Sequence, residues 1–140
     1  MVAAGFDSIP INTFSYYDQI LDTAVLVGAL PARYDGIADP LDRYFAAARG
    51  TGEIAPLEMT KWFDTNYHYI VPELSASTTF SLDDSAFLED VSDQIKRVGT
   101  AVRPVLVGPL TYLSLARTTD GSSALSHLDE LFATYARLLP

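Results

Sequence analysis

Ionisable and aromatic side chains are concentrated in one short stretch of the chain, residues 58–69. The stretch combines Lys61 with two acids, one histidine and four aromatic rings, and the chain has only one other lysine, Lys96. An ammonium group among apolar neighbours loses hydration, so it usually has an anionic partner. Lys61 is therefore predicted to bind either an anionic ligand or a carboxylate of the chain itself. The carboxylates close to it in sequence are Glu58, Asp64 and Glu73.

Three of the nearby ionisable residues form a loose acid–base group, namely Asp64, His68 and Glu73. Such side chains can polarise a substrate or bind a metal ion through nitrogen and oxygen. Their spacing matches no established metal pattern. The favoured interpretation is that they hydrogen-bond within an aromatic loop and hold it in place.

Other residues offer weaker signals. Asn12 and Ser15 follow a predicted strand and could meet a ligand, although helix capping explains Ser15 without one. The rings of Trp62, Tyr67 and Tyr69 could stack on a flat heterocycle, but aromatic residues at this density are more often core. His127 is predicted to be a surface residue on the last helix.

Apolar periodicity, capping residues and breakers predict alternating strands and helices. Asp39 before a proline begins one helix, and Gly50 and Gly99 each end one. The aromatic segment 66–72 is predicted to be a structured loop. The predicted strands are 9–12, 57–63, 78–82 and 102–107, and the predicted helices are 16–30, 41–49, 84–98, 109–117 and 124–139.

Strands that alternate with helices predict parallel βαβ units, hence an α/β fold. A closed (βα)8 barrel needs roughly 250 residues, whereas this chain has 140. We therefore expect one domain, residues 1–140, with the fold of a partial (βα)8 TIM barrel too short to close. Residues 2–5 resemble the last turn of a helix, and 138–140 are apolar without a cap. Both features predict a piece of a larger domain that leaves sheet edges and a helix face exposed.

Composition excludes several classes of protein. A net charge of −9 argues against binding to nucleic acid or to anionic membranes. The absence of cysteine excludes disulfides and thiolate metal sites within the chain. No signal peptide and no membrane-spanning run is recognisable, so a cytoplasmic location is expected.

Several segments together resemble one family. Residues 58–73 look like the signature of the N-terminal domain of cobalamin-independent methionine synthase, and residues 12–19, 26–31, 44–50 and 104–113 fit the same family in order and spacing. The resemblance covers nearly the whole chain. Family members are longer and contain two (βα)8 barrels. They transfer a methyl group from 5-methyltetrahydropteroyltriglutamate to homocysteine and so make methionine.

The resemblance assigns a role to Lys61, because the corresponding lysine of the family contacts the folate substrate. It also implies zinc in the C-terminal barrel, where the metal activates the homocysteine thiol. The zinc ligands include cysteines and cannot lie in this chain, so no cofactor is expected bound to it. A basic folate-contacting segment near the family's N-terminus is missing as well. The expected partners are the folate polyglutamate substrate and the remainder of the synthase, and the isolated chain is predicted to be inactive.

Two alternatives stay open. The chain could be a stand-alone module that binds folate or another anion, or regulates a partner, without catalysis. It could also be a metal-dependent hydrolase that uses Asp64, His68 and Glu73.

Overall fold

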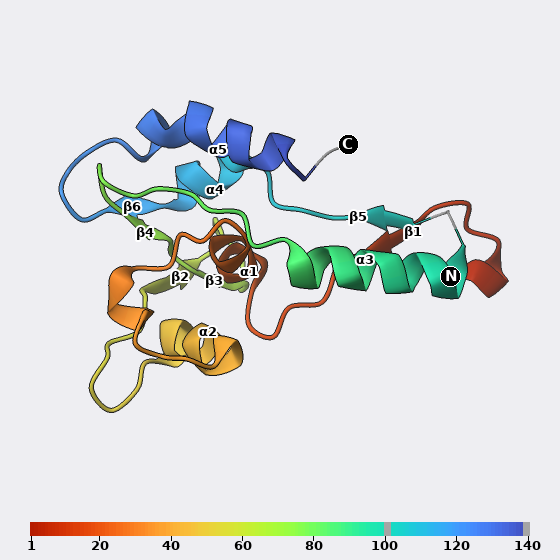
Figure 1. The fold of residues 1–140 in the computed structure, drawn as a ribbon, viewed down its shortest axis with the longest axis horizontal. Helices are drawn as coiled ribbons and strands as arrows, with labels where there is room; N and C mark the ends of the chain where they lie inside the picture. The colour runs from red at the N-terminus through yellow and green to blue at the C-terminus, as the bar shows by residue number, and fades with distance from the viewer. Residues whose placement is uncertain (100–101, 139–140) are drawn as a thin grey trace.

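The computed structural model describes residues 1–99 and 102–138. It is a mixed α/β structure of short elements (Figure 1). The helices are α1 (Gln19–Leu26), α2 (Pro40–Arg49), α3 (Ser85–Val98), α4 (Pro109–Leu115) and α5 (Leu128–Ala136), with the short 3-10 helices η1 (Val2–Ala4), η2 (Ala32–Tyr34) and η3 (Ala124–His127). The strands are β1 (Ile9–Ile11), β2 (Met59–Lys61), β3 (His68–Ile70), β4 (Glu73–Leu74), β5 (Val102–Pro104) and β6 (Arg117–Thr118).

Strand pairing confirms the parallel expectation only in part. β1 pairs with β5, and β4 pairs with β6, both in parallel. β2 and β3 instead form an antiparallel pair in which Met59 lies opposite Ile70. The prediction of a loop over 66–72 was therefore wrong, because a tight turn allows an immediate antiparallel return that a parallel pair does not. Within the described residues each sheet has two strands and none is closed, so the partial barrel stays a prediction.

Helix α1 is shorter than predicted and begins at a different cap. Asp18 takes the N-cap position, where its carboxylate accepts hydrogen bonds from the amides of Ile20 and Leu21. The chain leaves the helix at Gly28, whose φ of +62° favours glycine. A Cβ there would lie 2.6 Å from the carbonyl oxygen of Ser81, so the position also excludes a side chain on steric grounds.

The core lies on both sides of α1. One face of the helix contributes Ile20 and Ala24 to a cluster shared with β3, β4, α4 and α5. The other face contributes Leu21 to a second cluster, in which it meets Tyr44 of α2. Ile70 of β3 belongs to this second cluster, so α1 and β3 are held together by buried apolar surface as well as by hydrogen bonds.

The predicted termini of α2 and α3 are confirmed. Asp39 caps α2 by accepting from the amide of Asp42, and Gly50 ends the helix with a φ of +75°. Gly99 ends α3 in the same way, at a φ of +84°. The predicted last helix is divided between η3 and α5, and its expected end at 139, like residue 140, lies outside the described residues.

Helix α3 and the β1–β5 pair extend to one side of the molecule (Figure 1). None of the α3 side chains is buried, and Leu88 remains 47% exposed. This agrees with the exposed helix face expected from the sequence. The predicted strand 102–107 was wrong in length and burial, since β5 ends at Pro104 and none of its residues is buried. Residues 78–82 form no strand.

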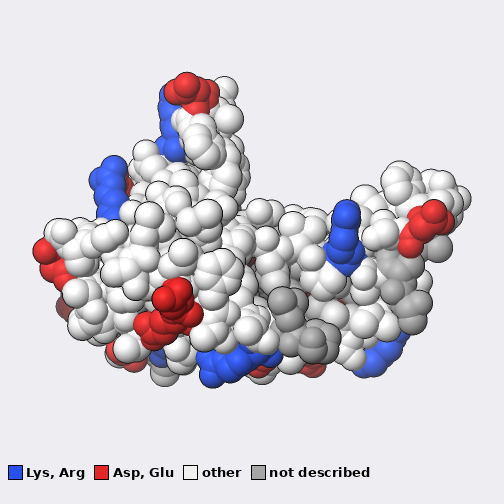
Figure 2. Space-filling model, turned by 90° about the horizontal axis from the view of Figure 1, so that it is seen from above, with Lys and Arg blue, Asp and Glu red and all other residues white. Residues whose placement is uncertain are grey.

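No described helix combines the length and hydropathy needed to cross a bilayer. On the face shown in Figure 2, Lys and Arg side chains are scattered among uncharged residues instead of forming a basic patch. Together with the net charge of −9, this distribution does not favour phosphate-backbone binding on that face.

Candidate functional site

Lys61 is the last residue of β2, in a hairpin that a compact turn closes. The Trp62 amide donates to the Tyr67 carbonyl at 2.7 Å. Within the turn, Phe63 adopts a φ of +51°, and the Thr65 hydroxyl donates to the Trp62 carbonyl at 2.6 Å. The hairpin is therefore ordered by its own backbone and places the lysine at its rim.

The ammonium group of Lys61 is exposed, and no salt bridge to it is found within 1–99 and 102–138. Two of the three carboxylates considered as internal partners are engaged elsewhere. Glu58 forms a salt bridge with Arg117, and Glu73 forms one with Arg33. The internal-salt-bridge interpretation of Lys61 thus has no partner in the described structure, and the anion-binding interpretation stays a prediction.

Asp64, His68 and Glu73 do not form the metal or acid–base cluster that the sequence allowed. Glu73 makes a bidentate pair with Arg33, and the Nδ1 atom of His68 lies 3.0 Å from the Asn66 carbonyl. No group of three potential metal ligands is found in the part of the chain that the structure describes. The hydrolase alternative therefore has no structural support there, and the zinc that the family resemblance implies has no matching ligand set in these residues.

The aromatic residues of the hairpin pack mainly on one another. Trp62 contacts the rings of Phe63, Tyr67 and Tyr69 edge-on, with centroids 5.4 to 6.3 Å apart. Tyr69 is buried in the main core cluster, and Trp62 packs against that cluster. The predicted core role holds for these two rings, whereas Tyr67 remains 48% exposed.

Asp18 is the buried acid that the sequence analysis did not single out. Its side chain is 1% exposed and accepts from the amides of Ile20, Leu21 and Ile70, the last at 3.0 Å. Burial raises the pKa of Asp18, while these three amide hydrogen bonds oppose the rise. An aspartate immediately before an apolar-periodic segment was the available signal for a cap. Nothing in the sequence pointed to the bond with β3.

Asp22 lies one turn further along α1 and is bonded to hydroxyl groups. Ser15 donates to one carboxylate oxygen, and Tyr44 donates to the other at 2.7 Å. The Tyr44 hydroxyl accepts in turn from the Tyr17 amide at 3.0 Å. Burial raises the pKa of Asp22, and the two hydroxyl bonds oppose that rise. Ser15 thus supports Asp22 and is not the helix cap.

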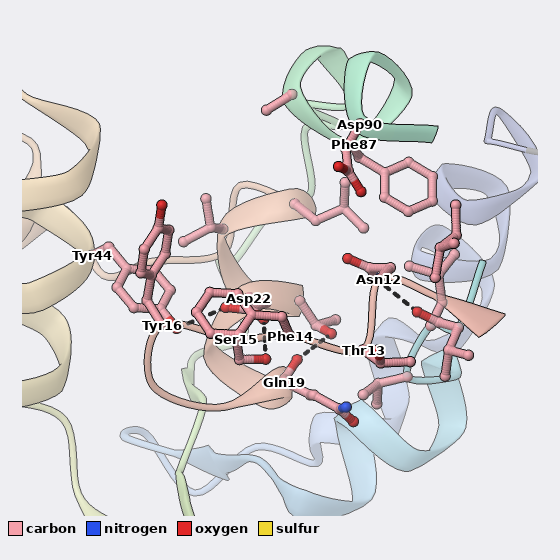
Figure 3. A pocket seen from close by; sticks show the side chains of 18 of the residues that line it. Asn12, Thr13, Phe14, Ser15, Tyr16, Gln19, Asp22, Tyr44, Phe87 and Asp90 are labelled. Carbon is pink, nitrogen blue, oxygen red and sulfur yellow. Dashed lines mark hydrogen bonds between the residues drawn. The ribbon is translucent and has the colours of Figure 1, made fainter. Parts of the chain in front are cut away.

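A cavity of about 820 Å³ lies between the segment after β1, helix α1 and helix α3 (Figure 3). Phe87 and Asp90 border it from α3, and Tyr16 borders it from the opposite segment. The charged residues among its described lining are the acids Asp22, Asp83 and Asp90. Because an anion would be repelled there and Lys61 is not part of the lining, this cavity is not the predicted anion site.

Asn12, at the edge of the same cavity, has an internal partner. Its side-chain amide donates to the Val105 carbonyl at 2.7 Å, and its backbone adopts a φ of +56°. The residue fastens the segment after β1 to the segment after β5, which explains it without a ligand.

His127 corrects another prediction, because it is buried and not on the surface. Its ring is 7% exposed, packs edge-on against Phe80, and places Nε2 2.9 Å from the Ser75 carbonyl. A solitary histidine on an amphipathic segment carries no sequence signal for such a contact, which joins segments 52 residues apart.

Comparison with known proteins identifies the family. The model described as "Cobalamin-independent synthase, N-terminal domain" matches residues 1–140. The chain is 57% identical over 140 residues to the 5-methyltetrahydropteroyltriglutamate–homocysteine methyltransferase of Mycobacterium tuberculosis (strain ATCC 25618 / H37Rv), an alignment that covers 99% of this chain and 18% of the relative. Proteins of the same name from Corynebacterium efficiens and Corynebacterium glutamicum (strain R) are 58% and 60% identical over 147 and 144 residues, covering 99% and 97% of this chain and 19% of each relative.

The chain therefore belongs to the cobalamin-independent methionine synthase family. The family resemblance read from residues 58–73 is confirmed. The chain spans less than a fifth of the length of these curated relatives.

Proposed function

We propose that this chain supplies part of the folate side of a methyltransferase that moves a methyl group from 5-methyltetrahydropteroyltriglutamate to homocysteine. Lys61 binds a carboxylate of the triglutamate tail. The single observation that carries the proposal is an exposed ammonium group, fixed at the rim of a hairpin, without an acid partner in the described structure. The substrate and the reaction are those for which the relatives are named.

Electrostatics explains why one lysine can matter in this chain. The net charge of −9 repels a polyanionic tail, so binding depends on local cations. Arg33 and Arg117 are paired with Glu73 and Glu58, so these arginines near the hairpin are already neutralised in part. An ammonium–carboxylate hydrogen bond is charge-assisted and about twice as strong as a neutral one.

The chemical step belongs to other parts of the enzyme under this proposal. Zinc, which the family resemblance implies for the C-terminal barrel, would activate the homocysteine thiol there, and the described residues of this chain offer no ligand set for it. This chain binds and orients the tail of the methyl donor, and the remainder of the synthase is its partner. We place the assembled enzyme in the cytoplasm.

Titration with folate triglutamate tests the role of Lys61. Lys61→Ala should weaken binding by about 1.5–3 kcal/mol, which is the loss of one charge-assisted contact. Lys96→Ala is the matched control, because Lys96 is the other lysine and pairs with Asp93 on α3. The proposal fails if the two variants bind equally well, or if the chain binds no triglutamate.

A methyl-transfer assay of the isolated chain with added zinc tests the division of labour. We expect no turnover above the protein-free control, even where the titration shows binding. Turnover by the chain alone would refute the assignment of the chemical step to the rest of the enzyme.

A further inference from the structure

His68 lies directly across the hairpin from Lys61. Backbone bonds join Trp62 to Tyr67 on one side of this pair and Glu58 to Val71 further along the ladder. Because bonded and non-bonded pairs alternate in an antiparallel ladder, Lys61 and His68 form a non-hydrogen-bonded pair. In such pairs the Cα atoms are only about 4.5 Å apart and both side chains leave the same face.

The hydrogen bond at Nδ1 fixes which nitrogen of His68 is free. Nδ1 lies 3.0 Å from the Asn66 carbonyl oxygen, and a carbonyl only accepts, so Nδ1 carries the proton. The other nitrogen, Nε2, is then an acceptor in the neutral ring and becomes a donor when the ring is protonated. No hydrogen bond to Nε2 is found in the described structure.

The charged groups around His68 leave this nitrogen available. On β2 the neighbour is Lys61, and in the turn it is Asp64. On α1, which packs against β3, the ionisable groups are Asp18 and Asp22. Asp18 is bonded to three backbone amides and Asp22 to two hydroxyls.

Glu58, just before β2, and Glu73, the first residue of β4, are also engaged, since both pair with arginines. The Lys61–His68 face of the hairpin therefore has two groups that can carry positive charge, and the nearest glutamates do not neutralise them.

We infer that His68 is the second anion-binding residue of this site and that one carboxylate of the ligand is held between its Nε2–H and the ammonium group of Lys61. This inference rests on the proposed function and adds a partner to Lys61. A carboxylate between the two groups removes their repulsion and favours the protonated ring, so binding takes up one proton at Nε2. The tail carboxylates stay ionised above about pH 5, and affinity therefore rises as the pH falls through the range in which histidine titrates.

Affinity for folate triglutamate, measured at about pH 8 and about pH 5.5, tests the inference. We expect the unmodified chain to bind roughly tenfold more tightly at the lower pH, because the protonated ring of His68 can donate from Nε2 to the carboxylate. His68→Asn should bind with the same affinity at both pH values. The asparagine amide can still donate to the Asn66 carbonyl, so the turn is preserved while the titrating group is removed.

Proton NMR of the two histidines gives a second readout that needs no variant. At about pH 7, saturation with the triglutamate should move the ring-proton signals of His68 toward those of a protonated imidazole, whereas the signals of the buried His127 should stay in place. His68 signals that do not move at saturation, or a His68→Asn variant that keeps the pH dependence, overturn the inference.

Lys61→Ala separates the inference from the proposed function. If Lys61→Ala weakens binding while His68→Asn leaves the pH dependence intact, the proposed function stands and the inference fails. If Lys61→Ala binds as tightly as the unmodified chain, or if no triglutamate binds, both fail.

Discussion

Two neighbouring regions of the molecule differ in the burial and the hydrogen bonding of their ionisable side chains. At the start of α1, Asp18 is buried and Asp22 is half-buried, and their carboxylates accept hydrogen bonds from amides and hydroxyls. On the hairpin that packs against α1, Lys61 and the neighbouring His68 are exposed, and neither forms a salt bridge within the described residues.

The difference separates structural groups from groups available to a ligand. A buried carboxylate must have its hydrogen bonds satisfied inside the protein. If the carboxylate is removed by mutation, the buried groups that donated to it lose their acceptor, which costs stability. An exposed ammonium group is hydrated by water in both the folded and the unfolded chain. Removing it should therefore change the free energy of unfolding very little. Asp18 and Asp22 should therefore control stability, and Lys61 together with His68 should control binding.

The largest effect is expected at Asp18. Asp18→Ala removes the cap of α1 and leaves the buried Ile70 amide unbonded, so the free energy of unfolding should fall by about 2–4 kcal/mol. Urea denaturation followed by circular dichroism measures it. Asp18→Ser is the matched control, because serine can cap the helix but does not reach Ile70, and it should restore about 1 kcal/mol. A loss below about 1 kcal/mol for alanine would contradict the structural role.

A smaller loss of stability is expected when the Tyr44 hydroxyl, which donates to Asp22, is removed. Tyr44→Phe removes the donor to Asp22 and the acceptor of the Tyr17 amide. Unfolding should become easier by about 1–2 kcal/mol. The neighbouring Tyr16 is 65% exposed, and Tyr16→Phe should change stability by less than about 0.5 kcal/mol. Equal effects of the two substitutions would show that the Tyr44 hydroxyl contributes nothing.

The pH dependence of stability gives a third test. Burial raises the folded-state pKa of Asp22 above its ordinary value of 3.8, so the folded chain holds that proton more tightly than the unfolded chain. Stability relative to Asp22→Asn should rise as the pH falls through the folded-state pKa and level off below 3.8. Thermal denaturation of both proteins across this range measures the difference. A relative stability that falls on acidification would reverse the predicted sign.

The smallest effect is expected at the hairpin. Lys61→Ala should change the free energy of unfolding by less than about 0.5 kcal/mol, because no internal ion pair is lost in the described structure. Chemical denaturation measures it beside Lys96→Ala, which loses an exposed ion pair on α3. A loss above about 1 kcal/mol at Lys61 would reveal a structural role and remove the contrast between the two regions.

Sequence patterns correctly predicted the features that depend only on neighbouring residues. The cap at Asp39 and the terminal glycines Gly50 and Gly99 lie where the sequence placed them, since their bonds and φ angles depend on neighbouring residues alone. The mixed α/β class and the family were also readable, the latter because residues 58–73 form a long and specific motif. Lys61 was singled out from its scarcity and its neighbours.

Contacts between residues far apart in the sequence could not be predicted from it. The return of the chain at β3, the bond from Asp18 to Ile70 and the burial of His127 each join residues whose separation along the sequence hides their contact. The same limit applies to Lys61, for which the sequence offered three acid partners and no means of choosing among them.

The sequence by itself therefore determined both ends of α2, the C-terminal end of α3, the family and the one lysine worth testing. Only the tertiary structure decided that Glu58 and Glu73 pair with arginines and that His68 faces Lys61. The physical reason is that capping and turns are satisfied within a few residues, whereas the competition among charges is resolved only after folding brings distant side chains together.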